Sequence, residues 1–150
     1  YGVMYNGGDS TTRIGSYLNS DMHKTGLNSY INLVREYFTS RVIVHPEYLT
    51  GLFSSSGDDI SEKTNVTMCI PNSIMIFGMQ HPTRIDKSVT YCNKQLSLFK
   101  IAPKFIRNAS GFWLRDQIGG AQFANVDFEG CFGMSFVNNL YEIRPYFCIG

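Results

Sequence analysis

The chain lacks the features that mark several large classes of protein. Only 17% of its residues are charged, and 13 Lys and Arg against 12 Asp and Glu leave a net charge of +1. No Lys/Arg run exceeds two residues, so the basic stripe of a nucleic-acid-binding protein is missing. No apolar stretch approaches the roughly 18 residues of a membrane-spanning helix, and no signal-peptide pattern opens the chain. We therefore expect no nucleic-acid partner and no membrane insertion.

Close pairs of metal-binding residues are also missing. The four cysteines lie far apart without a C-x-x-C pair, and the three histidines form no H-x-x-x-H or H-E-x-x-H pair. The serines have no G-x-S-x-G turn, and no titratable cluster has the spacing of a nucleophile and its base. The sequence predicts no catalytic residues, no metal and no cofactor. It favours buried free thiols over two disulfide bridges, an alternative that an oxidising compartment would permit.

The residues that are present suffice for one folded unit. With 150 residues, of which 43% are hydrophobic and 14% aromatic, the chain can bury a sizeable core. We expect a single domain over residues 1–150. Tyr1 is not an initiator Met and opens a strand-like segment. We therefore expect the domain to be the C-terminal part of a longer protein, which allows its first strands to precede residue 1.

The first third of the chain shows a helical pattern. Apolar residues recur at helical spacing from Leu27 to Phe38 and predict an amphipathic helix of about three turns. A shorter helix is expected over residues 21–24, capped by Asn19 or Ser20, with Gly26 separating the two helices.

Further along, a short helical turn is expected over residues 74–77. Asn72 or Ser73 can cap its start, and Gly78 can stop it.

Strands are predicted in two places. Residues 41–44 read as a strand that Pro46 ends, and from Phe112 onward short strands are separated by glycines. Helices first and strands later, with few alternations, predict an α+β fold whose mostly antiparallel, twisted sheet lies toward the C-terminus.

The last forty residues carry the strongest functional signal. Two segments rich in aromatic residues, 112–116 and 143–149, bracket residues 117–141, whose side chains follow no core pattern. A rigid frame that presents a variable surface has this appearance, which favours recognition over chemistry. We expect Trp113 and Phe147 to be largely buried. The predicted frame residues are Trp113, Arg115, Arg144 and Pro145.

Within the bracketed stretch, alternation divides the residues between two faces. Ala124 and Val126 are expected in the core, which places Asn125 and Asp127 on the opposite face. Alternate residues from Phe132 to Phe136 should line one face of an extended segment, although they can instead fill a core or a subunit interface. The predicted ligand-binding residues are Gln122, Asn125, Asp127, Glu129, Phe132, Met134, Phe136, Asn138 and Asn139.

These motifs resemble a terminal domain of tail and fibre proteins from phages and prophages. The matching segments are Phe112-Trp113-Leu114-Arg115-Asp116, Phe123-Ala124-x-Val126, Gly130 and Arg144-Pro145-x-Phe147-x-Ile149, preceded in the same order by Leu98-Phe99 and Pro103-Lys104-Phe105-Ile106. The resemblance covers nearly all of the chain.

The resemblance implies a C-type-lectin-like fold, in the branch that contains formylglycine-generating enzymes and retroelement-diversified adhesins. In that branch the residues before the Arg-Pro strand contact the ligand. The calcium-dependent sugar motifs are not matched, because Ile70-Pro71-Asn72 lacks a preceding carboxylate and Asn125-Val126-Asp127 lacks the Trp-Asn-Asp order. Calcium-dependent sugar chelation is therefore not implied.

Three functions follow from the resemblance, in falling order of preference. The first is a non-enzymatic binding module on the virion surface, at a tail fibre or receptor-binding tip, that recognises a host-surface glycan or protein. It would assemble with other fibre or tail subunits, with a homotrimer implied. The second is a structural knob that binds no receptor. The third is an oxidase related to the formylglycine-generating enzymes, whose reactive cysteine pair would have to be Cys131 and Cys148.

Overall fold

The computed structural model describes residues 3–4, 17–38, 41–53, 59–79, 95–119 and 121–150. Their elements in chain order are β1 (Val3–Met4), η1 (Tyr17–Asn19), η2 (Met22–Gly26), α1 (Leu27–Phe38), β2 (Val42–Ile43), β3 (His45–Phe53), β4 (Asp59–Val66), α2 (Ser73–Phe77), α4 (Ser97–Ile101), η4 (Pro103–Ile106), β5 (Phe112–Gly119), β6 (Gln122–Val126), β7 (Phe132–Phe136), β8 (Leu140–Tyr141) and β9 (Cys148–Ile149). The described strands form four small antiparallel sheets, which confirms the predicted α+β class. No helix among the described residues combines the length and the hydropathy of a membrane span.

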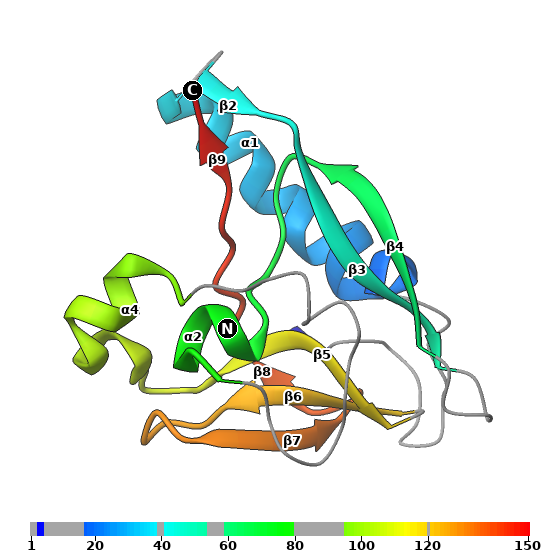
Figure 1. Cartoon of the computed structure of the whole chain (residues 1–150), viewed down its shortest axis with the longest axis vertical. Helices are drawn as coiled ribbons and strands as arrows, with labels where there is room; N and C mark the ends of the chain where they lie inside the picture. Colours follow the sequence, from blue (N-terminus) through cyan, green and yellow to red (C-terminus); the bar gives the residue numbers. More distant parts are fainter. Residues whose placement is uncertain (1–2, 5–16, 39–40, 54–58, 80–94, 120) are drawn as a thin grey trace.

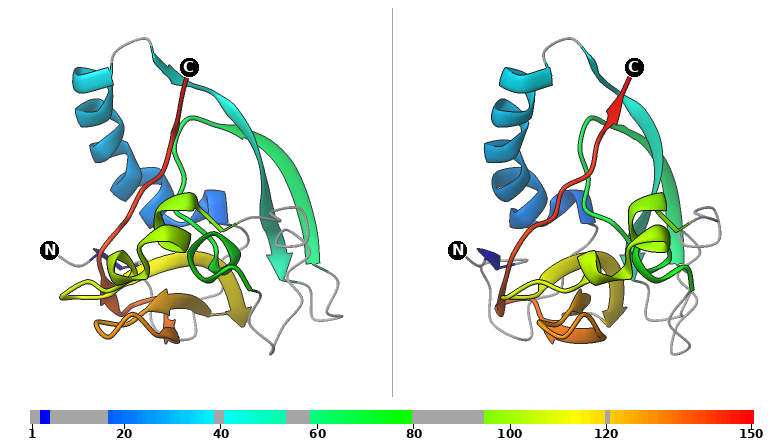
Figure 2. Two further views of the ribbon diagram at one scale, coloured as in Figure 1. Left: turned by 60° about the vertical axis from the view of Figure 1, so that its left-hand side comes forward. Right: turned by 90° about the vertical axis from the view of Figure 1, so that its left-hand side faces the viewer.

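The elements spread along the long axis of the molecule. Figure 1 shows the three-stranded sheet β5–β6–β7 at one end with α2 and α4 beside it, and the β2–β9 pair at the other end. In Figure 2, α1 and the β3–β4 hairpin extend as two arms, with the C-terminal segment between them. The sheet of β5, β6 and β7 is the predicted C-terminal sheet.

The N-terminal helices join directly at a glycine. The π-helix η2 leads directly into α1, because Leu27 keeps a right-handed helical conformation and its N–H bonds to the carbonyl of Met22. The predicted boundary between the two helices is confirmed at Gly26, where the π-helix ends and the α-helix begins. The chain does not leave the helical conformation there, because Met22 and Leu27 are buried in the same core cluster. The predicted capping by Ser20 is confirmed, since its Oγ accepts the N–H of His23 at 3.2 Å.

Pro46 lies inside a strand. It sits opposite Asn65 in the antiparallel β3–β4 pair, so the prediction that it ends a strand is wrong. Proline lacks an N–H donor, but among the described strands β3 pairs only with β4, and a residue on an edge strand needs no second ladder partner. The strand predicted over residues 41–44 is confirmed by β2, which pairs with β9.

The α2 helix begins and ends where its sequence predicts. Asn72 Oδ1 accepts the N–H of Met75 at 2.9 Å, and Gly78 adopts φ 75° while its N–H bonds to the carbonyl of Ile74. The side chain and N–H of Ser73 bind the Asp116 carboxylate at 3.0 and 2.7 Å, which joins this helix to β5.

Both faces of the three-stranded sheet are buried at its centre. Trp113 and Phe123 face a cluster that also contains Met22, Leu27 and Ile70. The alternate positions Phe112, Leu114, Ala124 and Val126 face a second cluster with Ile76, Phe99 and Ile106. Trp113 is fully buried, which confirms the prediction for this residue, whereas Phe147 is only partly buried against the first cluster.

Candidate functional site

The frame around the bracketed stretch is held by a buried cation. Arg115 on β5 is 1% exposed, and its guanidinium lies 3.0 Å from Glu47 Oε2 on β3. It also donates to the hydroxyl of Tyr146 at 2.8 Å and to Sγ of Cys69 at 3.3 Å. Burial opposes the charge, but the neighbouring Cys69, Tyr146 and Glu47 outweigh it and raise the pKa of Arg115 above its ordinary value. Three distant segments are thereby joined to β5.

The same cluster gathers residue types that catalyse reactions in other proteins. The sequence shows His45 and Cys69 as isolated residues, and the fold brings both to Glu47 and Tyr146. Burial, above all other causes, raises the pKa of Tyr146, so its hydroxyl stays protonated and donates to Glu47 Oε1. Among the described residues Cys69 is fully buried, and the His45 side chain is 10% exposed. We interpret the cluster as structural.

The second frame arginine connects the C-terminal segment to η4. Arg144 donates to the carbonyl of Phe105 at 2.6 Å and to that of Arg107 at 3.1 Å, and its guanidinium lies 4.4 Å from the ring centroid of Phe112. Burial lowers the pKa of Arg144, and the nearby Glu142 carboxylate partly offsets this. The half-buried Pro145 follows directly in the chain.

Asn125 is not on an exposed face. It is 2% exposed, and its Nδ2 donates to Ser135 Oγ at 2.8 Å. Gly133 lies opposite it on β7, where a Cβ atom would come within 2.5 Å of Asn125 Oδ1. The prediction that Asn125 is exposed is wrong because the sheet is covered on both faces, so alternation does not separate core from solvent. Gly133 is the sequence signal for this buried amide, since a small residue must face it.

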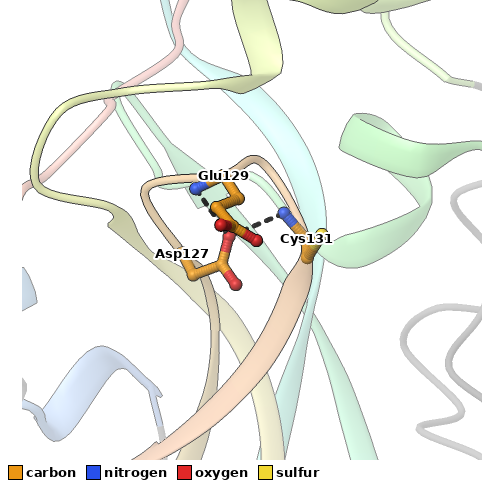
Figure 3. Close-up of side chains that lie close together, drawn as sticks. All are labelled: Asp127, Glu129 and Cys131. Atoms are coloured by element: carbon orange, nitrogen blue, oxygen red, sulfur yellow. Dashed lines mark hydrogen bonds between the residues drawn. The ribbon is translucent and has the colours of Figure 1, made fainter.

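The turn between β6 and β7 is built on Asp127. Its Oδ1 accepts the backbone N–H of Glu129 at 2.9 Å and that of Cys131 at 2.8 Å (Figure 3). One ligand atom from each of these three side chains lies within 4.8 Å of the others, although the sequence pattern predicts no metal site. Carboxylates and a thiolate are ligand types that suit zinc. However, Oδ1 of Asp127 is already engaged by two backbone N–H groups of the turn, and exposed acidic groups commonly lie together without a metal. Asp127 is half-buried and Glu129 is exposed.

The cysteines differ in burial. Among the described residues Cys69, Cys131 and Cys148 are free, but only Cys69 is buried. The expectation of a buried thiol is wrong for Cys131, because it follows the turn glycine Gly130 at the surface. Cys92 lies outside the described residues.

The alternate residues of β7 share one face, as predicted, but differ in exposure. Phe132 is half-buried, with its ring 6.2 Å from that of Phe77, so the core alternative holds for this residue. Met134 is 49% exposed and Phe136 43% exposed. Phe128, in the preceding turn, is 65% exposed and was not predicted. Of the remaining predicted residues, Asn139 is exposed, whereas Gln122 and Asn138 are half-buried.

Comparison with known proteins adds nothing to this description of the site. The chain matches no protein-family model, no curated protein and no solved structure. Its own geometry gives two separate surface features near the β5–β6–β7 sheet: the apolar face of β7 with its acidic turn, and a groove beside η4.

Proposed function

We propose that this chain is a non-enzymatic binding module with a C-type-lectin-like fold, on the virion surface of a phage, where it recognises a host-surface glycan or protein. The observation that supports this best is the half-exposed pair Met134 and Phe136 together with the exposed Phe128. Large apolar side chains at the surface of a rigid element are typical anchors of recognition sites. The motif resemblance adds the virion context.

The support beneath this face is rigid. All five residues of β7 pair with β6, and four of the five residues of β6 are buried. The side chains of Met134 and Phe136 therefore protrude from a strand whose neighbour is fixed by the core. Side chains that are ordered before binding lose less entropy when a partner docks.

The chemistry around the anchors suits either partner class. Aromatic rings can stack on sugar rings, and the carboxylate of Glu129 and the amide of Asn139 can bind hydroxyl groups. The same groups suit a protein epitope, where aromatic anchors lie inside a polar rim.

Replacing Phe128 or Phe136 by Ala tests the proposal. At least one change should reduce adsorption of the purified chain to host cells by about tenfold or more, the loss of a recognition anchor. Both variants should melt within a few degrees of the parent, because neither side chain is a core residue. Ile101→Ala is the control, since Ile101 is an exposed apolar residue on α4, outside the β7 face and outside the proposed subunit contact. Variants that adsorb as well as the Ile101 control would place recognition elsewhere.

A structural knob without a receptor is the second candidate. Exposed apolar residues also occur at the other end of the molecule, with Tyr37 on α1 at 78%, Val44 after β2 at 62% and Ile149 on β9 at 50%. That surface fits contacts with other fibre subunits, including a homotrimer.

The oxidase alternative finds little support. Cys148 lies in β9 and Cys131 directly precedes β7, and these strands lie at opposite ends of the molecule (Figure 1). A reactive pair requires the two thiols side by side.

A further inference from the structure

A groove with a cavity volume of about 490 Å³ lies between the α4–η4 segment and the C-terminal segment. Leu98, Phe99 and Phe105 line one wall, and Ile143, Pro145 and Tyr146 line the other. The volume falls within the range of roughly 300–1,000 Å³ that small-molecule sites have. Leu98 and Phe105 are 54% and 49% exposed, so the apolar lining is open to solvent.

The two walls are fixed to each other. The guanidinium of Arg144, which belongs to the C-terminal wall, bonds to the carbonyls of Phe105 and Arg107 on the opposite wall. Behind it, Tyr146 exchanges two backbone hydrogen bonds with Cys69, at 2.8 and 3.1 Å. A ligand would enter a groove that already exists, which lowers the cost of binding.

A cation lies beside the groove. Lys104 Nζ lies 5.4 Å from the centroid of the Phe105 ring, and Phe105 lines the groove. The charge of Arg144 in the wall is partly balanced by the Glu142 carboxylate, which also accepts a hydrogen bond from Nδ2 of Asn108. The described lining residues include no carboxylate. An apolar floor beside the Lys104 ammonium group complements a molecule that is itself apolar with an anionic end.

We propose that this groove binds a small amphipathic ligand, with an aromatic or acyl body against Leu98 and Phe105 and one anionic group at Lys104. This site is distinct from the β7 face and does not depend on the proposed host recognition.

Two dyes that differ by one sulfonate test the proposal on the 150-residue chain. 1-Anilinonaphthalene-8-sulfonate is anionic, N-phenyl-1-naphthylamine is neutral, and both fluoresce in apolar sites. We expect saturable binding of the sulfonate with one site per chain. Lys104→Gln should weaken it by about threefold or more, the loss expected of a partly exposed ion pair, and leave the neutral dye unchanged. Leu98→Gln should weaken both dyes.

Matched controls lie on α4, the helix that also contains Leu98 and directly precedes η4 with Lys104. Lys100 and Ile101 are exposed on α4 and do not line the groove, so Lys100→Gln and Ile101→Gln should leave both dyes unchanged. Circular dichroism should show all four variants folded. Absence of saturable binding, or dye binding insensitive to Leu98→Gln, would overturn the site. Equal effects of Lys104→Gln on the two dyes, or none on either, would overturn the anionic ligand class.

Discussion

Arg115 occupies a position where a charge is costly. Only 1% of the residue is exposed, and the Glu47 side chain is 12% exposed, so neither charge regains its hydration by turning outward. The pair is stable in the core only because each charge has the other and both contact Tyr146. This dependence makes the pair sensitive to the loss of one partner.

Removing the Arg115 cation alone should therefore destabilise the fold strongly. We expect Arg115→Met to lower the free energy of unfolding by about 3–5 kcal/mol, because it leaves the Glu47 carboxylate buried without a counter-charge. Urea unfolding measures this. Arg115→Met combined with Glu47→Gln should be more stable than Arg115→Met alone. If the double variant is less stable, the ion pair is not the reason for the loss.

His23 gives the fold a sensitivity to acid. Burial, with a smaller effect of Lys24, lowers its pKa below the ordinary value of 6.5. At position 23 the unfolded chain therefore takes up a proton at higher pH than the folded chain. The free energy of unfolding is unaffected by His23 above about pH 6.5 and decreases as the pH falls below that value. Urea unfolding between about pH 7.5 and 5.5 should show this fall, reduced in His23→Gln. An identical pH slope in the variant would assign the fall to other groups.

At the scale of elements, two turn glycines differ in what surrounds them. Gly111 precedes β5 at φ 67°, and Gly130 precedes β7 at φ 83°. A Cβ atom on Gly111 would come within 2.5 Å of the backbone oxygen of Val126, whereas one on Gly130 would meet Cγ of Arg107 at 2.8 Å. The first contact is with a backbone oxygen of the sheet at 2.5 Å, and the second is with an inner methylene of a side chain, whose backbone nitrogen lies farther away at 3.4 Å.

Alanine should accordingly cost more at Gly111. We expect Gly130→Ala to lose about 1 kcal/mol from backbone strain, and Gly111→Ala to lose clearly more because β6 must also move. Thermal or urea unfolding of the two variants compares them directly. Equal losses would mean that backbone conformation alone sets the cost.

The elements predicted correctly depend on local chemistry. The side-chain cap of Asn72 and the left-handed conformation of Gly78 act within one helical turn, so the sequence determines α2 without reference to the rest of the fold. The path through Gly26 and the strand through Pro46 depend on partners far along the chain. At those two positions the local sequence predicts a break in the helix and the end of a strand, and packing against distant residues outweighs both preferences.

The candidate site, too, is predicted from the sequence only where its structure depends on neighbouring residues in the chain. The sequence places Phe132, Met134 and Phe136 on one face, because strand geometry has period two, and the register of β7 agrees. It does not show that Phe132 meets Phe77 or that Asn125 is covered from both sides. Burial of those residues depends on α2 and on the second core cluster, whose packing no single segment specifies.

At the scale of the whole molecule, the exposed apolar surface is divided between two ends. The β7 face lies by the three-stranded sheet, and the second surface lies where α1, β2 and β9 end (Figure 1). The β2–β9 pair has only two described strands, so both of its edges have backbone groups without a strand partner among the described residues. Such edges together with apolar side chains favour association. Separate ends allow one surface to assemble subunits while the other remains free for a partner.

We expect the chain to self-associate through the β2–β9 end, with a trimer as the assembly that the sequence resemblance implies. Val44→Lys and Tyr37→Lys should shift the assembly toward monomer, because each places a charge where an apolar contact is lost. Sedimentation across a range of concentrations measures the mass. Ile101→Lys is the control, since Ile101 is 82% exposed on α4 near the opposite end. A parent chain that stays monomeric at every concentration would contradict the assembly, whereas oligomers equally stable in all three variants would move the interface to another surface.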